Sequence, residues 1–166
     1  MAFGLIACCF ATPTLAATRS FTGNVCALVT ASQIATIVGD SKVSKYTCAS
    51  QPTQTTPAAT NYDGKAGTST VSKGGFLEVR VMKYKSPSME NLVRGEFKTL
   101  KPVPGIGDWA FTHIAVSPVY GGKADAGEFV FGAKGYGVLF NVRAVEGKMV
   151  NQAALQSLAK SIVAVL

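Results

Sequence analysis

The sequence has few of the residues and motifs that enzymes use for catalysis. It contains a single histidine, His113, and nine acidic residues among 166, and these acids form no D-x-D or E-x-x-H cluster. A G-x-S-x-G elbow, a P-loop, a Rossmann fingerprint and a C-x-x-C pair are all absent. The sequence therefore predicts no catalytic residue, no metal site and no cofactor. A carboxylate pair assembled only by the fold is still open, and with it a small hydrolase.

Long apolar runs and glycosylation sequons are also missing. Hydrophobic residues make up 48% of the chain and the mean hydropathy is +0.26, yet no apolar run reaches the roughly 18–20 residues that a membrane-spanning helix needs. This hydrophobic content is enough for a packed core and excludes a disordered chain. The length suits one domain. Because no N-x-[ST] sequence occurs, a bacterial envelope or secreted protein fits better than a eukaryotic secretory one.

The first seventeen residues are uncharged and are typical of a secretory signal peptide. Residues 2–11 form an apolar block, Pro13 interrupts it, and Thr14 and Ala16 supply small side chains at −3 and −1 before a cut. A basic n-region is missing, so the true start of the signal is left open. A buried N-terminal helix in place of a signal is the other alternative. We expect residues 1–17 to be the signal and residues 18–166 to be a single exported domain. A second interpretation of the same stretch is a lipobox with lipidation at Cys8.

Removal of the signal leaves two cysteines, Cys26 and Cys48. An even pair in an exported domain favours one disulfide. It would close a loop of about twenty residues, which contributes about 3 kcal/mol in the chain-entropy model. Zinc binding is the weaker interpretation, because a zinc site takes four ligands and His113 is far away in sequence.

Periodicity predicts helices and strands in alternating groups. Thr30 and Gln33 form a capping box, Gly39 is a stop, and the alternation of Leu77, Val79 and Val81 is typical of a strand with one buried face. Strands 128–133 and 136–144 are expected to form a hairpin that turns at Lys134 and Gly135. The predicted elements are helix 25–40, strand 45–50, loop 51–67, strand 76–85, a helix from Ser86 with apolar residues at helical spacing, strand 108–116, loop 120–127, strands 128–133 and 136–144, and helix 148–165.

This order predicts an α+β domain with an antiparallel sheet and flanking helices. Phe129 and Phe131 alternate with Val130, so part of the sheet is expected to be covered on both faces.

Three groups of residues together resemble a known family. They are the Cys26-Ala27-Leu28-Val29-Thr30 start, Cys48, and the Val103 to Ala110 turn with its Pro-Gly-Ile-Gly-Asp-Trp sequence. The chain resembles the secreted lipoprotein family of unknown function that is best known from actinobacteria. Its members are similar in layout to the extracellular sensor domain of a mycobacterial-type serine/threonine kinase. The resemblance covers residues 24–166 and implies a Cys26–Cys48 disulfide, a fold of the Mog1/PsbP type and no catalytic residues. The chain lacks the clear lipobox and polar tether of many members, which puts anchoring in doubt.

The net charge of +7 is concentrated in the middle of the chain. Residues 65–101 carry eight basic and three acidic residues. Such a region suits an anionic envelope polymer or lipid surface, whereas nucleic acid is not expected in an exported protein. A solvated face that keeps the protein soluble is the simpler interpretation. The candidate residues for anion binding are Lys73, Arg80, Lys83, Lys85, Arg94 and Lys98.

These observations favour an exported, non-enzymatic envelope domain that binds a ligand or a protein partner. The alternative is a basic module that docks on an anionic polymer or membrane. A small hydrolase is the third hypothesis. His113 shares its predicted strand face with Trp109 and Phe111, which is more typical of a packing surface than of a catalytic triad.

Overall fold

The structure is a computed structural model. It describes residues 21–43, 46–48, 52–56, 59–67, 74–118, 122 and 124–166, with the side chains of 46–48 and 65–67 left aside. The predicted signal peptide, Cys8 and Lys73 lie outside these residues. The elements are η1 (Val25–Ala27), α1 (Ala31–Val38), β1 (Tyr46–Cys48), β2 (Gln54–Thr55), β3 (Ala59–Gly67), β4 (Phe76–Tyr84), α2 (Pro87–Glu96), β5 (Lys101–Pro102), β6 (Trp109–Val116), β7 (Asp125–Ala133), β8 (Tyr136–Arg143) and α3 (Gln152–Val165).

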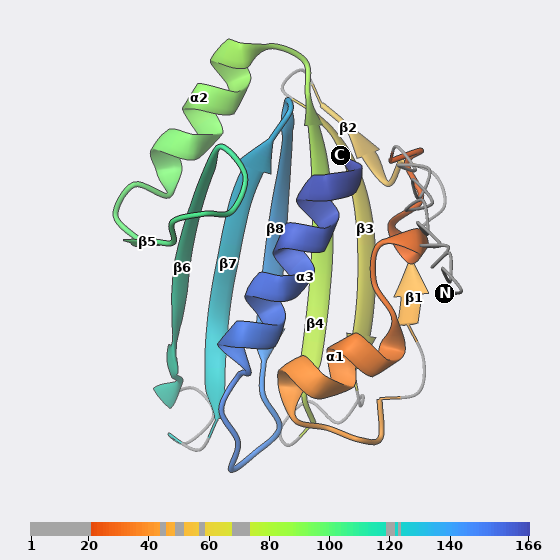
Figure 1. The fold of residues 1–166 in the computed structure, drawn as a ribbon, viewed down its shortest axis with the longest axis vertical. Helices are drawn as coiled ribbons and strands as arrows, with labels where there is room; N and C mark the ends of the chain where they lie inside the picture. The colour runs from red at the N-terminus through yellow and green to blue at the C-terminus, as the bar shows by residue number, and fades with distance from the viewer. Residues whose placement is uncertain are drawn as a thin grey trace, which may run out of the picture.

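The described strands form one antiparallel sheet, which confirms the predicted α+β class (Figure 1). Its order is β1-β3-β4-β8-β7-β6-β5, with β2 paired to β3 off this path. After β4 the chain runs through α2 to the far edge at β5. It then returns strand by strand, so that β8 closes against β4. β4 therefore joins the strands that precede α2 to the strands that follow it.

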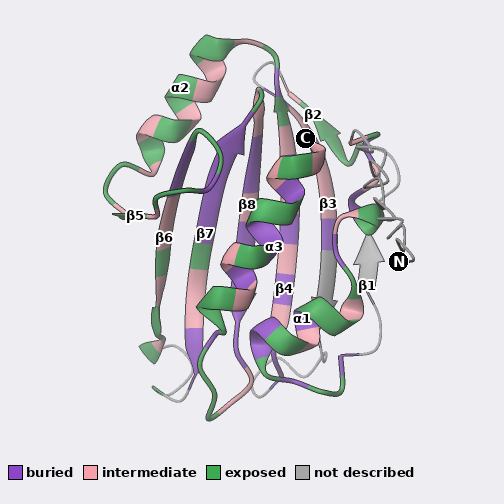
Figure 2. Ribbon diagram, viewed as in Figure 1, coloured by how far each residue is buried: buried purple, intermediate pink, exposed green. Residues whose placement is uncertain are grey.

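The hydrophobic core lies between one face of the sheet and the helices α1 and α3, which lie side by side over it (Figure 1). Leu77, Val79 and Val81 of β4 are fully buried on this face, as their alternation predicted. Rings of β7 and β8 fill its centre, where Phe131 and Phe140 meet edge-on with centroids 5.6 Å apart. Figure 2 shows the buried residues concentrated in the sheet and on the inner sides of α1 and α3.

The capping signals at the first helix are confirmed, but the helix is shorter than residues 25–40. Thr30 accepts from the Gln33 amide and Gln33 reaches back to Thr30, which completes the capping box. Gly39 ends the helix in the left-handed region at φ 72°. Because this cap requires Thr30 to be extended, the preceding residues form the separate 3-10 turn η1 and not a continuous helix.

The prediction of a loop over residues 51–67 is wrong, because β2 and β3 lie there. All nine residues of β3 pair with β4, and its other edge pairs with β1 and β2. Asp63 of β3 also forms an ion pair with Arg80, Nε to Oδ1 2.7 Å. The Ala, Asn, Asp and Gly residues of β3 are weak strand formers, but pairing on both edges outweighs this low propensity. The strand predicted over 45–50 is confirmed for Tyr46–Cys48 as β1, and residues 45, 49 and 50 lie outside the described ones.

The hairpin and the two-sided burial are confirmed. β7 and β8 turn at Lys134 and Gly135, which have φ 54° and 80° as a tight hairpin turn requires. The loop expected over 120–127 ends earlier, because β7 already begins at Asp125. Val130, on the face opposite Phe129 and Phe131, has no exposed surface.

The last two helices differ from their predictions in extent and packing. Ser86 caps α2 with Pro87 in its first turn, as expected. Its apolar residues are not buried, however, and Leu92 is 62% exposed. The helical spacing ran past the helix end, since Phe97 is already the C-cap. The predicted helix 148–165 begins only after Asn151, whose side chain accepts from the Ala154 amide and so fixes the start of α3.

Candidate binding face

The sheet has a second face, opposite α1 and α3, that no described helix covers along its length. We call it the open face. Antiparallel register sets its side chains in three rows across β6, β7, β8 and β4. The glycine row is Trp109, Gly132, Gly137 and Met82; the apolar row is Phe111, Val130 and Leu139; the polar row is His113, Glu128, Asn141 and Glu78.

The glycine row is the part of the open face that α2 contacts. Trp109 donates from its indole nitrogen to Glu90 of α2 at 3.0 Å. The Trp109 ring lies over Gly132 and the Tyr84 hydroxyl lies over Gly137, so a Cβ at either glycine would collide with these rings. Trp109 is 6% and Tyr84 8% exposed. The two glycines thus give the space in which two aromatic rings are buried between the sheet and α2.

Tyr84 is unusual because its buried hydroxyl has no hydrogen-bond partner in the described residues. Burial, with the nearby charges of Glu90 and Glu96, raises the pKa of Tyr84 well above its usual 10. The phenol therefore stays protonated at any physiological pH. A neutral, unpaired hydroxyl at this place is a packing group and not a base.

The apolar row begins at the β6 edge and ends at an ion pair. Phe111 and Leu139 are half-buried on either side of the fully buried Val130. Leu139 is directly opposite Arg80, which in turn is opposite its partner Asp63. Apolar side chains therefore cross three adjacent strands, with charged groups at the end on β4 and β3.

The polar row places acids beside the single histidine. His113 on β6 is directly opposite Glu128 on β7, and both are exposed. Asn141 and Glu78 continue the row on β8 and β4. His113 shares its strand face with Trp109 and Phe111, as the alternation predicted. Glu128 was not predicted, because the register between two strands cannot be derived from the sequence of either one. No serine or cysteine is in this row to act as a nucleophile.

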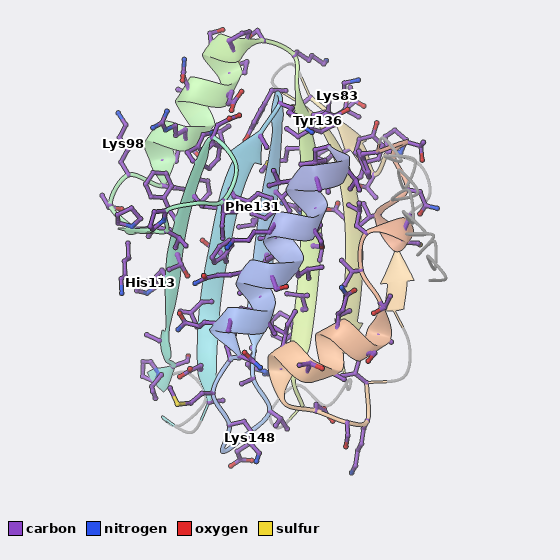
Figure 3. All side chains as sticks on the ribbon, viewed as in Figure 1. Lys83, Lys98, His113, Phe131, Tyr136 and Lys148 are labelled. Carbon is purple, nitrogen blue, oxygen red and sulfur yellow. The ribbon has the colours of Figure 1, made fainter. Side chains whose placement is uncertain are left out.

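The predicted basic residues do not gather on one surface. Arg80 is on the open face and is neutralised by Asp63. Lys83 is on the opposite face, 5.8 Å from the centroid of the Tyr136 ring. Figure 3 shows Lys98 at the α2 side of the molecule, well away from Lys83. Lys85, Arg94 and Lys98 are exposed around α2, while Lys73 lies outside the described residues.

The cysteine prediction is supported in part by placement. Cys26 is in η1 and is disulfide-bonded, and the side chain of its partner lies outside the described ones. The backbone of η1 contacts β1, which ends at Cys48. The pairing of Cys26 with Cys48 stays a prediction that this contact favours.

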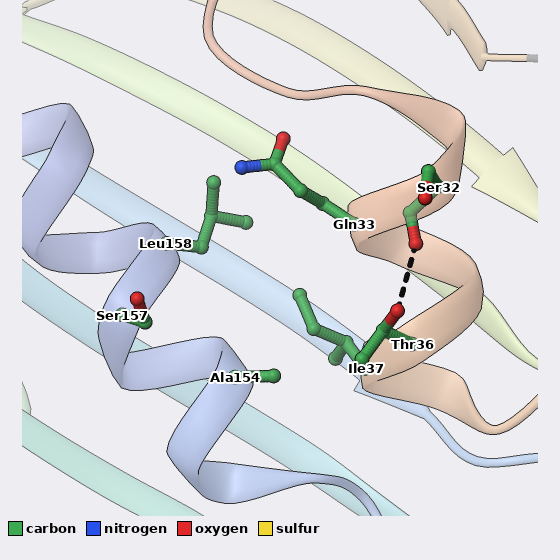
Figure 4. A pocket seen from close by; sticks show the side chains of 7 residues that line it. All are labelled: Ser32, Gln33, Thr36, Ile37, Ala154, Ser157 and Leu158. Carbon is green, nitrogen blue, oxygen red and sulfur yellow. Dashed lines mark hydrogen bonds between the residues drawn. The ribbon is translucent and has the colours of Figure 1, made fainter.

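A shallow pocket lies on the helical side, between α1 and α3 (Figure 4). Its volume is about 200 Å³, and it is partly open to solvent. Thr36 already donates to the Ser32 carbonyl at 3.0 Å, and Gln33 is occupied by the capping box. Two of the four polar side chains that line the pocket are thus used within α1 and its cap. The lining residues are Ser32, Gln33, Thr36, Ile37, Ala154, Ser157 and Leu158.

Among the described residues, no three His, Cys, Asp or Glu side chains gather closely enough to hold a metal ion. In the same part of the chain, no helix combines the length and apolar character needed to span a membrane.

Comparison with known proteins gives no match. No family model, no curated protein and no solved structure matches the chain. The resemblance to the actinobacterial lipoprotein family and to the Mog1/PsbP type therefore stays a prediction.

Proposed function

We propose that this protein is an exported, non-enzymatic domain of the bacterial envelope that binds a protein partner through the open face of its sheet. The observation that carries the proposal is the half-buried pair Phe111 and Leu139, on either side of the buried Val130. The polar row flanks them on the part of the face that α2 does not contact. An apolar centre with a polar rim is the usual composition of a protein interface. An open sheet face of this kind suits a protein better than a small molecule, which needs a concave site.

Export is the part of the proposal that comes from the sequence. The uncharged apolar block and small residues of positions 1–17, and the cysteine pair of the remaining chain, support it. The envelope is also where the resembling family is found. Export is compatible both with release of the protein and with a lipid anchor at Cys8.

The experiment is photo-crosslinking in the host cell envelope. The full chain carries a photoreactive phenylalanine analogue at Leu139, in the centre of the open face, or at Ser157, an exposed residue of α3. We expect one discrete protein adduct from position 139 and none from position 157, at equal expression and melting temperature. Adducts from position 157 alone, or from neither position, would overturn the proposed face.

The same preparation distinguishes the basic-surface alternative. An apolar interface keeps its adduct when salt is raised from about 0.1 M to about 1 M, because screening acts on exposed charges. An adduct that disappears with salt, and that is lost on Arg94→Ala with Lys98→Ala, would instead assign binding to the exposed cations around α2.

A further inference from the structure

The edge strand β6 is covered by its neighbour for only part of its length. β5 pairs Lys101 with Thr112 and Pro102 with Phe111, and the Val103 amide donates to the Ala110 carbonyl at 2.9 Å. β6 continues to Val116. Its last four residues therefore extend past the end of β5.

The free backbone groups of this segment can be assigned from the ladder. The Ser117 amide donates to Ala124 on the β7 side at 3.0 Å, whereas the Ala110 carbonyl is turned toward β5. Residues alternate in direction along an antiparallel strand, and the amide and carbonyl of one residue point the same way. Ile114 and Val116 thus point both groups away from β7. β5 pairs only with Thr112 and Phe111, and none of the described backbone hydrogen bonds outside the ladders uses the groups of Ile114 or Val116.

Within the described residues, this edge lacks the features that usually protect an edge strand. Proteins block such edges with charged side chains, proline or a covering segment. Residues 112–117 contain no Asp, Glu, Lys or Arg, and the first proline is Pro118. Val116 is 58% exposed.

We propose that two copies of this chain pair antiparallel through the exposed end of β6, about a two-fold axis at Ala115. In this register Ile114 of each copy exchanges two backbone hydrogen bonds with Val116 of the other. The four bonds use every free amide and carbonyl of Ile114 and Val116 in both copies. Ala115 faces its own counterpart, where two small side chains fit the close approach of a non-hydrogen-bonded pair.

Charge and length support a second copy as the occupant. Two chains of net charge +7 repel at most surfaces, but this segment brings no like charges together. β5 limits the free edge on one side and Pro118 on the other, so the interface is short. An interface well below the roughly 1,200–2,000 Å² of stable complexes gives a dimer that forms only as concentration rises.

The first test measures mass against concentration by sedimentation velocity. Val116→Pro removes the outward amide without removing a bond to β7, a position where edge strands tolerate proline. The matched control, Val116→Thr, keeps the amide and the β-branch. We expect the parent and the threonine variant to shift from monomer to dimer with concentration, and the proline variant to stay monomeric with an unchanged melting temperature. A parent that stays monomeric to about 1 mM, or a proline variant that dimerises equally, would overturn the proposal.

The second test checks the register by disulfide trapping under mild oxidation, with the unmodified chain as the baseline for its own cysteines. Ala115→Cys places two thiols opposite each other at the axis, within the Cα separation that a disulfide allows. His113→Cys lies on the same face of the same strand, but four residues out of register with its counterpart. Covalent dimer from position 115 only supports the pairing. Equal yields at both positions, or trapping of a different protein, would contradict it.

Discussion

At the scale of single residues, the open face depends on two glycines, because they have no Cβ atom. Gly132 and Gly137 are neighbours on β7 and β8, and the rings of Trp109 and Tyr84 occupy the space where their Cβ atoms would be. The sheet can therefore bury aromatic rings beside a helix that itself buries no residue. The role of these glycines is packing and not backbone freedom, since neither has a positive φ.

Gly132→Ala tests this packing. The added methyl group meets the Trp109 ring, which Glu90 holds by a hydrogen bond, so we expect a loss of about 1–3 kcal/mol in the free energy of unfolding. Urea denaturation followed by tryptophan fluorescence measures it. The control is Gly95→Ala in α2, where nothing lies within 4 Å of the new methyl group, and helix propensity gives unchanged or slightly higher stability. Similar losses in both variants would contradict the packing role.

Tyr84→Phe tests the unpaired hydroxyl. Burial raises the pKa of Tyr84 above its usual 10 in the folded chain, so above pH 10 the unfolded chain releases a proton that the folded chain retains. Stability therefore falls as pH rises through this range. Between about pH 8 and about pH 10.5 we expect the parent to lose about 1 kcal/mol more than the phenylalanine variant. At pH 8 the variant should be at least as stable, because no described partner loses a hydrogen bond. Parallel pH profiles would show that the hydroxyl is solvated.

At the scale of elements, α2 and α3 are held in the molecule by different amounts of contact. α3 buries Leu155, Leu158, Ala159 and Ile162 against the core, whereas α2 buries none of its residues (Figure 2). The indole bond from Trp109 to Glu90 is the described side-chain hydrogen bond that connects α2 to the sheet. A helix with so little burial gains little stability from packing.

Hydrogen exchange should separate the two helices. We expect the amides of α2 to exchange much faster than those of α3, by local opening that leaves the sheet intact. Mass spectrometry of peptides from residues 87–96 and 152–165 measures the difference, and Glu90→Gln should widen it by weakening the indole contact. α1, shorter than α2 but with three buried residues, is the internal control and should exchange more slowly than α2. Equal protection of α2 and α3 would show that α2 is an integral part of the core.

At the scale of the whole molecule, the sequence predicted the parts of the fold that local chemistry determines. The capping box at Thr30, the alternation in β4 and the turn at Lys134 each follow from neighbouring residues, and all three are confirmed. β3 was missed because its stability comes from the strands on both sides of it, which its composition does not record.

The candidate binding face was harder to predict for the same reason. His113 and Glu128 are fifteen positions apart in sequence and become neighbours only through the β6–β7 register. The apolar row likewise takes one residue from each of three strands. A one-residue slip would bring different side chains together, so no pattern within a single strand could define the face.

The position of β4 in the sheet also has a consequence for how the chain is made. β4 pairs with β3 directly before it, but its other edge waits for β8, with Phe76 opposite Arg143. As the polypeptide emerges from the ribosome, this central strand keeps one open edge until nearly all of the domain has been synthesised. Pairings so distant along the chain form slowly. Nascent chains of this topology would therefore have an incomplete sheet for most of their synthesis, and an incompletely folded chain is easier to pass through a narrow translocation pore than a finished domain.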